Sequence, residues 1–259
     1  MLKNKRLFLL DMDGTIYLGD RLFDCTPRFL DWVRAQGGQF MYFTNNSSKS
    51  ASQYLEKLRK MGVSANAAQL ITSTGATIAY LAKHHKGKRA YALGTAAFVD
   101  ELRGAGVNVT THLEDGIELL VMGFDTELSF QKLEDACILL GRGAEYIATN
   151  PDLVCPTEFG SVPDCGSVAV MLKNATGREP VFIGKPCPLM VEMALERAGI
   201  PKEQVLLVGD RLYTDIACGG AAGVETALVL SGESTRDDVK TSPHRPTYIF
   251  ENLDGIMEV

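Results

Sequence analysis

Short apolar runs alternate with helix-like repeats along most of this chain. Residues 7–10 are apolar without interruption, which is typical of a strand buried on both faces. Apolar residues then recur at helical spacing between Pro27 and Gly37, and Thr26 is the predicted N-cap of that helix. The same alternation predicts further strands at 39–43, 181–183, 205–208, 227–230 and 247–250, and further helices that begin at Ser47-Ser48 and span 188–198.

The middle of the chain contains an alternation of its own. Strands are predicted near 89–93, 118–122 and 145–149, with helices near 95–104 and 129–141. This is enough for a second α/β unit inserted into the first. We therefore predict an α/β fold with two parts, namely a doubly wound, Rossmann-like parallel-sheet core formed by 1–75 and 184–259, and a large inserted α/β cap domain formed by 76–183.

Composition narrows the class of protein. The chain has 259 residues, of which 46% are hydrophobic and 22% charged, as in globular proteins with a substantial core. Its net charge of -6 argues against a nucleic acid or an anionic membrane as partner. No apolar stretch approaches the ~20 residues of a membrane-spanning helix, and the run after the basic start is too short for a signal peptide. We therefore expect a cytoplasmic protein whose six cysteines are reduced.

Polar residues with chemical capacity follow four of the predicted core strands. These residues are Asp11, Thr44, Lys185 and Asp210. In an open parallel sheet, ligands bind outside the carboxyl ends of the strands. Each residue alone could belong to an ordinary turn or helix cap. Four such residues at four strand ends instead favour a single shared crevice.

The residue types in this crevice predict a metal ion and a phosphate. Clustered carboxylates repel one another unless a cation lies between them. Asp11, Asp210 and Asp215 offer the oxygen ligands that suit Mg²⁺, which commonly binds together with a substrate phosphate. Lys185 and the hydroxyl of Thr44 supply a positive charge and a hydrogen-bond donor for that phosphate.

The pair Asp11 and Asp13 predicts covalent phosphoryl transfer. Asp11 would attack phosphorus to form an aspartyl-phosphate. Asp13 would protonate the leaving alcohol and later deprotonate the attacking water. Residues two apart in an extended segment point the same way, so both carboxylates can address one phosphoryl group. Gly14 allows the chain to turn away close to the ligand.

These residues resemble the four motifs of haloacid dehalogenase superfamily phosphatases. The matching segments are Asp-Met-Asp-Gly-Thr at 11–15, Thr44, Gly-Lys-Pro at 184–186, and the segment from Gly209 to Asp215. The chain is also similar to the 4-nitrophenylphosphatase, or NagD-like, branch of that superfamily. This narrower similarity rests on Thr-Asn-Asn at 44–46, on the large cap, and on Ala-Thr-Asn-Pro-Asp at 148–152.

The resemblance implies an enzyme that hydrolyses phosphomonoesters of small metabolites. It implies a Mg²⁺ cofactor and pairing of two copies through the cap. Sugar phosphates, phosphoglycolate, pyridoxal phosphate and nucleoside monophosphates all fit the motifs as substrates. By resemblance, Asp11 is the nucleophile and Asp13 is the general acid/base. The resemblance also implies that Mg²⁺ is held by Asp11, by the backbone carbonyl of Asp13 and by Asp210, with Asp215 in support. The implied phosphate ligands are Thr44, Asn45 and Lys185.

Two segments of the cap bear on substrate recognition. Asn150 and Asp152 follow a predicted strand, and we expect them to hydrogen-bond the leaving group, although Asn-Pro-Asp is also a common turn. The second segment, Pro-Asp-Cys-Gly at 163–166, departs from the Pro-Gly-x-Gly usual in the branch because Asp164 replaces a glycine. The backbone path of that loop is therefore less directly implied by the resemblance than the core motifs are.

Other classes of protein use similar residues. A signalling receiver module also holds a phosphoryl group on Asp beside a Thr and a Lys, but it needs only about half this length and no second Asp two residues on. A binding-only protein would not need the full catalytic set. A phosphomutase shares the core motifs, although a large cap makes hydrolysis the favoured reaction.

Overall fold

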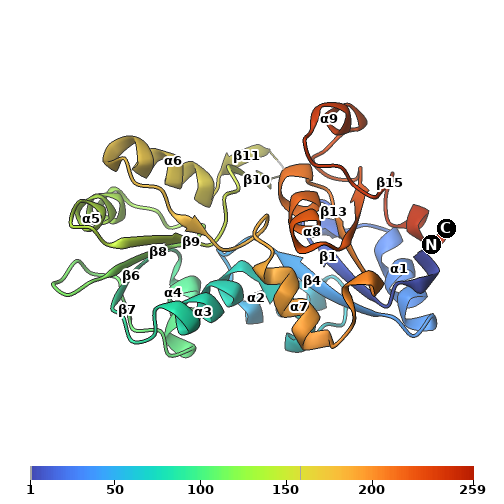
Figure 1. Ribbon diagram of the computed structural model, residues 1–259, viewed down its shortest axis with the longest axis horizontal. Helices are drawn as coiled ribbons and strands as arrows, with labels where there is room; N and C mark the ends of the chain where they lie inside the picture. Colours follow the sequence, from blue (N-terminus) through green and yellow to red (C-terminus); the bar gives the residue numbers. More distant parts are fainter. Residues whose placement is uncertain (1, 158) are drawn as a thin grey trace. The chain divides into compact units, whose positions relative to one another are not determined.

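The computed structural model describes residues 2–157 and 159–259, and its elements form two compact units (Figure 1). The core unit comprises Met1–Thr44, Leu55–Ile71 and Lys185–Val259, and the inserted unit comprises Asn45–Tyr54 and Thr72–Gly184. The segment 76–183, which we predicted as a cap, lies within the inserted unit. That unit also includes the residues that directly follow Thr44.

A six-stranded sheet organises the core unit, with the strand order β15-β14-β13-β1-β4-β5. β1 pairs in parallel with β4 on one side and with β13 on the other, and β13, β14 and β15 continue in parallel. The chain therefore builds outward from β1 in both directions, which confirms the predicted doubly wound α/β fold. In such a sheet the reversal beside β1 is the point where ligands bind. The strands are β1 Leu7–Asp11, β4 Gln39–Thr44, β5 Leu70–Thr72, β13 Val205–Gly209, β14 Glu225–Val229 and β15 Tyr248–Phe250.

Helices connect these strands. β1 and β13 are buried at every position, as expected for central strands covered on both faces. A short hairpin of β2 Tyr17–Leu18 and β3 Arg21–Leu22 follows β1. The α-helices are α1 Cys25–Ala35, α2 Ala51–Lys60, α7 Leu189–Ala198, α8 Ala217–Ala222, α9 Arg236–Thr241 and α10 Asp254–Met257, with short helices η1 Leu2–Asn4, η2 Ala67–Gln69, η3 Lys202–Gln204 and the π-helix η4 Leu212–Ile216.

The inserted unit has its own parallel sheet, in the order β12-β9-β8-β6-β7. In Figure 1, α5 and α6 lie on one side of this sheet and α3 and α4 on the other. An antiparallel hairpin of β10 and β11 precedes α6. The elements are α3 Ser73–His84, β6 Ala90–Leu93, α4 Ala96–Gly104, β7 Val109–Thr110, β8 Leu119–Met122, α5 Phe130–Gly141, β9 Glu145–Ala148, β10 Val154–Thr157, β11 Gly160–Pro163, α6 Cys165–Thr176 and β12 Val181–Phe182.

Two predicted helix starts are wrong. α1 begins at Cys25, so Thr26 lies inside the helix, and its hydroxyl donates to the carbonyl of Ile16 at 2.7 Å instead of capping. α2 begins at Ala51 rather than at Ser47-Ser48. The hydroxyl of Ser47 lies 2.8 Å from that of Thr149 and accepts the backbone N–H of Phe124. In both places a distant partner satisfies the hydroxyl that the local pattern assigned to a cap.

The structure bears on two further expectations. All six cysteines are free, as predicted. Among the residues that the structure describes, no helix has the length and apolar character needed to cross a membrane.

Candidate active site

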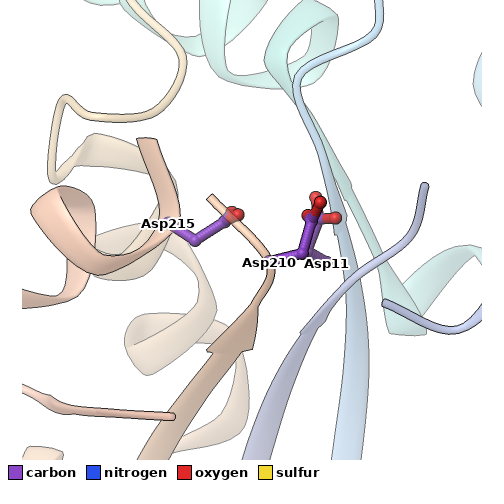
Figure 2. Close-up of side chains that lie close together, drawn as sticks. All are labelled: Asp11, Asp210 and Asp215. Carbon is purple, nitrogen blue, oxygen red and sulfur yellow. The ribbon is translucent and has the colours of Figure 1, made fainter. Parts of the chain in front are cut away.

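Three carboxylates meet at the carboxyl edge of the core sheet. Asp11 is the last residue of β1, Asp210 follows β13 directly, and Asp215 lies on η4. Because β1 and β13 are parallel neighbours, with Leu10 opposite Val208, their ends reach the same edge. One oxygen of each carboxylate lies within 4.8 Å of the others, and Figure 2 shows Asp215 pointing toward Asp11 and Asp210.

Lys185 lies among these carboxylates. Its side chain is only 2% exposed, and its Nζ donates to Asp11 Oδ1 at 2.5 Å, to Asp215 Oδ1 at 2.6 Å and to the carbonyl of Phe43 at 3.2 Å. Burial alone would lower the pKa of this amine, but the two carboxylates outweigh it and hold the pKa above its usual range. Lys185 is therefore a cation, and with three ionised carboxylates the cluster would carry a net charge of about -2.

The electrostatics of the cluster favour an added divalent cation. Burial, together with the charges of Asp11 and Asp215, raises the pKa of Asp210 well above its usual value. Burial also raises the pKa of Asp215, to about 6, against the opposing effect of Lys185. Oδ1 of Asp210 is buried and has no hydrogen-bond partner within the described part of the chain. A carboxylate oxygen in that state is costly, and a hard cation would satisfy it. The donor set therefore fits Mg²⁺.

Backbone packing holds Asp210 in place. The backbone N–H of Glu233 donates to Asp210 Oδ2 at 2.7 Å. A Cβ at Gly14, whose φ is +85°, would lie 2.4 Å from that oxygen, and one at Gly232 would lie 2.0 Å from it. Gly14 was predicted from the sequence to be a turn residue, whereas the segment around Gly232 was not predicted to belong to the site. This segment follows β14 and has no motif in the sequence that would mark it as part of the site.

Asp13 has partners that the sequence did not reveal. Its Oδ2 accepts a hydrogen bond from the hydroxyl of Tyr17 at 3.1 Å, and Lys57 Nζ lies 4.0 Å from its Oδ1. Lys57 Nζ also lies 3.9 Å from the centre of the Tyr17 ring. The side chain of Asp13 is 32% exposed, so it can exchange protons. Tyr17 could have been suspected from its place four residues after Asp13, whereas Lys57 on α2 gives no local signal.

Thr44 and Thr15 complete the edge. Thr44 ends β4 and is buried, and the preceding Phe43 pairs with Asp11 across the sheet. The hydroxyl of Thr15 donates to Asp11 Oδ2 at 3.3 Å. The structure thus places Asp11, Asp13, Thr44, Asp210 and Asp215 at the carboxyl ends of core strands or on the turns that follow them. The prediction that Lys185 follows a fourth core strand is wrong, because β12 Val181–Phe182 pairs with β9 in the sheet of the inserted unit. Lys185 joins the cluster through the contacts of its amine with Asp11 and Asp215.

The other three predicted site residues belong to the inserted unit, where they lie together. Asn45 is only 6% exposed, Asp152 2% and Asn150 0%. The side-chain amide of Asn45 donates to Asp152 Oδ2 at 2.9 Å. Asn150 and Asp152 lie on the loop after β9, as predicted. In this structure their side chains contact other residues of the inserted unit.

The chain is similar to known hydrolases and phosphatases along nearly its whole length. The model of a haloacid dehalogenase-like hydrolase family matches residues 8–108, and a HAD-hydrolase-like model matches 182–256. An acid sugar phosphatase of Staphylococcus aureus is 36% identical over 253 residues, which are 98% of this chain and 97% of that protein.

Two solved structures extend the comparison. A 4-nitrophenylphosphatase of Thermotoga maritima is 40% identical, with a TM-score of 0.93 over 100% of this chain and 98% of its own. A glycerol phosphate phosphatase of Mycobacterium tuberculosis in complex with magnesium is 32% identical, with a TM-score of 0.92 over 99% of this chain and 78% of its own. With three of its four motifs at the ends of core strands and similarity along nearly its whole length, the chain belongs to the haloacid dehalogenase-like hydrolase family, in the 4-nitrophenylphosphatase or NagD-like branch.

Proposed function

We propose that this protein is a Mg²⁺-dependent phosphatase that hydrolyses small phosphomonoesters through an aspartyl-phosphate on Asp11. The observation that carries the proposal is the cluster of Asp11, Asp210 and Asp215 with the buried cation of Lys185. Three relatives, named an acid sugar phosphatase, a 4-nitrophenylphosphatase and a glycerol phosphate phosphatase, support the same reaction class. They make sugar and glycerol phosphates the first substrates to test.

Asp11 is suited to attack phosphorus because its charge is offset and its carboxylate is oriented. Lys185 donates to one oxygen and Thr15 to the other. In the first step an oxygen–phosphorus bond forms on Asp11 while the bond from phosphorus to the leaving oxygen breaks. Lys185 also reduces the repulsion between the anionic nucleophile and the anionic phosphate.

Asp13 would move the protons. In the first step its proton goes to the leaving oxygen, and in the second it takes a proton from the water that attacks phosphorus. The bond between Asp11 and phosphorus then breaks and inorganic phosphate leaves. Tyr17 and Lys57 hold the carboxylate of Asp13 while its partial exposure leaves it open to water.

The metal and phosphate ligands follow from the donor set and the family. Asp11, Asp210 and the backbone carbonyl of Asp13 would hold Mg²⁺, with Asp215 in support. When bound, the ion supplies positive charge that stabilises the oxygens of the transferring phosphoryl group. Thr44, Asn45 and Lys185 would bind the phosphate oxygens.

Turnover of a chromogenic phosphomonoester tests this proposal. The purified protein should release inorganic phosphate in many turnovers with Mg²⁺, lose activity after exhaustive chelation and regain it when Mg²⁺ is added. Ca²⁺ should restore less, because its longer bonds and looser geometry misplace the nucleophile. A stable phosphoprotein formed once per chain would instead indicate a receiver-like module. A rearranged phosphate ester without free phosphate would indicate a mutase.

A further inference from the structure

Asn150 and Asp152 lie in a buried polar network of the inserted unit that centres on Asn45. The backbone carbonyl oxygen of Asn45 accepts hydrogen bonds from the hydroxyl of Ser73 at 2.6 Å and from Nδ2 of Asn150 at 3.0 Å. The side-chain amide of Asn45 donates to Asp152 Oδ2. Both the backbone and the side chain of Asn45 are therefore tied to the loop after β9, more than a hundred residues away in sequence.

The amide of Asn150 is committed to this network. Its Nδ2 lies 3.0 Å from the carbonyl of Asn45, 3.1 Å from Asp152 Oδ2 and 3.4 Å from Asp164 Oδ1. If the Asn150 amide were flipped, its oxygen would face these three hydrogen-bond acceptors, so the contacts determine that Nδ2 points toward them. Oδ1 of Asn150 is buried as well and has no hydrogen-bond partner among the described residues. In this arrangement the Asn150 side chain offers no exposed group to a leaving alcohol.

Asp164 extends the network and replaces a glycine of the usual cap loop at a position where the structure does not require one. It is the N-cap of α6, with φ -105°, and its Oδ1 accepts the backbone N–H of Cys165 at 2.5 Å. That backbone conformation is open to any residue, so a glycine is not required there. Gly166 is the constrained position, because a Cβ there would lie 2.1 Å from the carbonyl oxygen of Pro151.

Close packing limits the movement of Asn45 from another direction. A Cβ at Gly184 would lie 2.5 Å from Asn45 Oδ1 and 2.5 Å from the carbonyl oxygen of Thr149. The glycine before Lys185 therefore makes room for Asn45. Displacement of Asn45 in a core packed this closely would break a buried hydrogen bond, leaving a polar group without a partner.

We infer that Asn150 and Asp152 are positioning residues that hold Asn45 in its phosphate-binding geometry. This inference rests on the proposed function, in which Asn45 binds phosphate. It differs from the expectation that the two residues hydrogen-bond the leaving group. If they act through Asn45, their loss weakens the binding of any phosphoryl group, whatever alcohol it carries.

Orthovanadate separates the two roles, because it resembles a phosphoryl group but has no leaving group. In Asn150→Ala and Asp152→Ala we expect the inhibition constant of orthovanadate to rise roughly tenfold. kcat/KM for an aryl phosphate and for a sugar phosphate should fall by similar factors. Asn108→Ala is the matched control. It removes an exposed asparagine beside Arg89, just before the edge strand β7, and it should change none of these values.

A double-mutant cycle tests the route of the effect. If Asp152 acts through Asn45, adding Asp152→Ala to Asn45→Ala should cost little more than Asn45→Ala alone. Asp152→Asn keeps an oxygen acceptor for the Asn45 amide, so it should stay within about threefold of the parent protein. If Asp152→Ala fails to fold, Asp152→Ser takes its place in the cycle, because the shorter side chain withdraws the acceptor from the Asn45 amide.

These experiments separate a failure of the inference from a failure of the proposed function. A loss on the sugar phosphate alone, with orthovanadate and the aryl phosphate unchanged, would overturn the inference in favour of leaving-group contacts. Additive losses in the double-mutant cycle would also overturn it. If the parent protein neither hydrolyses phosphomonoesters nor binds orthovanadate, the proposed function fails instead.

Discussion

At the scale of single residues, Lys185 determines what the carboxylates around it can do. Its buried ammonium bridges Asp11 and Asp215, which come from β1 and from η4. A buried charge pair is costly to form unless both partners are well hydrogen-bonded, and here the amine also donates to a backbone carbonyl. The cation offsets only part of the negative charge, so the site can still take up a divalent ion.

Asp11→Asn tests the nucleophile. An amide cannot form the aspartyl-phosphate, so we expect kcat to fall about a thousandfold or more while the fold is retained. Steady-state turnover of an aryl phosphate and circular dichroism measure the two effects. Asp31→Asn, an exposed position on α1, is the matched control and should behave as the parent protein does. Activity of Asp11→Asn within tenfold of the parent would exclude covalent catalysis through this residue.

The raised pKa values of Asp210 and Asp215 predict how Mg²⁺ binding depends on pH. The pKa of Asp215 is about 6 and that of Asp210 lies well above its usual value, both mainly because of burial. Below about pH 6 Asp215 holds a proton that Mg²⁺ must displace, and the raised pKa of Asp210 acts in the same direction, so affinity should fall as pH falls and binding should release protons. Calorimetry in buffers of different ionisation enthalpy would measure both. An affinity that stays constant from pH 5 to 7.5, with no proton release, would contradict the prediction.

At the scale of elements, the segments beyond the strand ends shape the site more than the strands do. The π-helix η4 carries Asp215 to the cluster, and the turn after β14 brings Gly232 and Glu233 to Asp210. π-helical turns are rare and occur often at functional sites.

Gly232→Ala tests the close approach to Asp210. The added Cβ would displace the carboxylate, so we expect Mg²⁺ affinity to fall and the free energy of unfolding to fall by about 1–3 kcal/mol. Gly220→Ala is the matched control, because a Cβ there meets open space on α8, and it should stabilise the protein by about 0.5–1 kcal/mol. Titration with Mg²⁺ and chemical denaturation measure the two quantities. Unchanged Mg²⁺ affinity in Gly232→Ala would show that the turn after β14 does not constrain Asp210.

At the scale of the whole molecule, the two units contribute different groups. The predicted metal ligands and the nucleophile all belong to the core unit, whereas Asn45, Asn150 and Asp152 belong to the inserted unit. Function resides in sites rather than in folds, so the same core site can occur with different insertions of this size.

This division predicts that metal binding and phosphate binding respond to different mutations. Asn150→Ala should leave the Kd for Mg²⁺ within about twofold of the parent value, since none of its contacts reaches a metal ligand. Calorimetric titration of the substrate-free protein provides the measurement. A tenfold loss of Mg²⁺ affinity in this variant would show that the network supports the metal site as well.

The sequence by itself determined the order and type of most elements. Apolar runs such as 7–10 and 205–208 became β1 and β13, because burial of central strands requires continuous hydrophobic segments. The same pattern predicted that Asp11 and Asp210 meet, since parallel neighbours end at one edge of the sheet. Helix starts were predicted less well, as Thr26 and Ser47 show, because a hydroxyl can satisfy either a local cap or a distant carbonyl.

Only the tertiary structure decided which polar atoms meet across long sequence separations. Nothing local links Lys57 to Asp13, or Asp152 to Asn45, because each contact depends on how whole elements pack. The buried Asp210 oxygen without a partner is likewise a property of packing, since the sequence carries no record of which side chains lose their water. Periodicity is local and survives in the sequence, whereas the position of each hydrogen-bonding atom depends on all the segments that surround it.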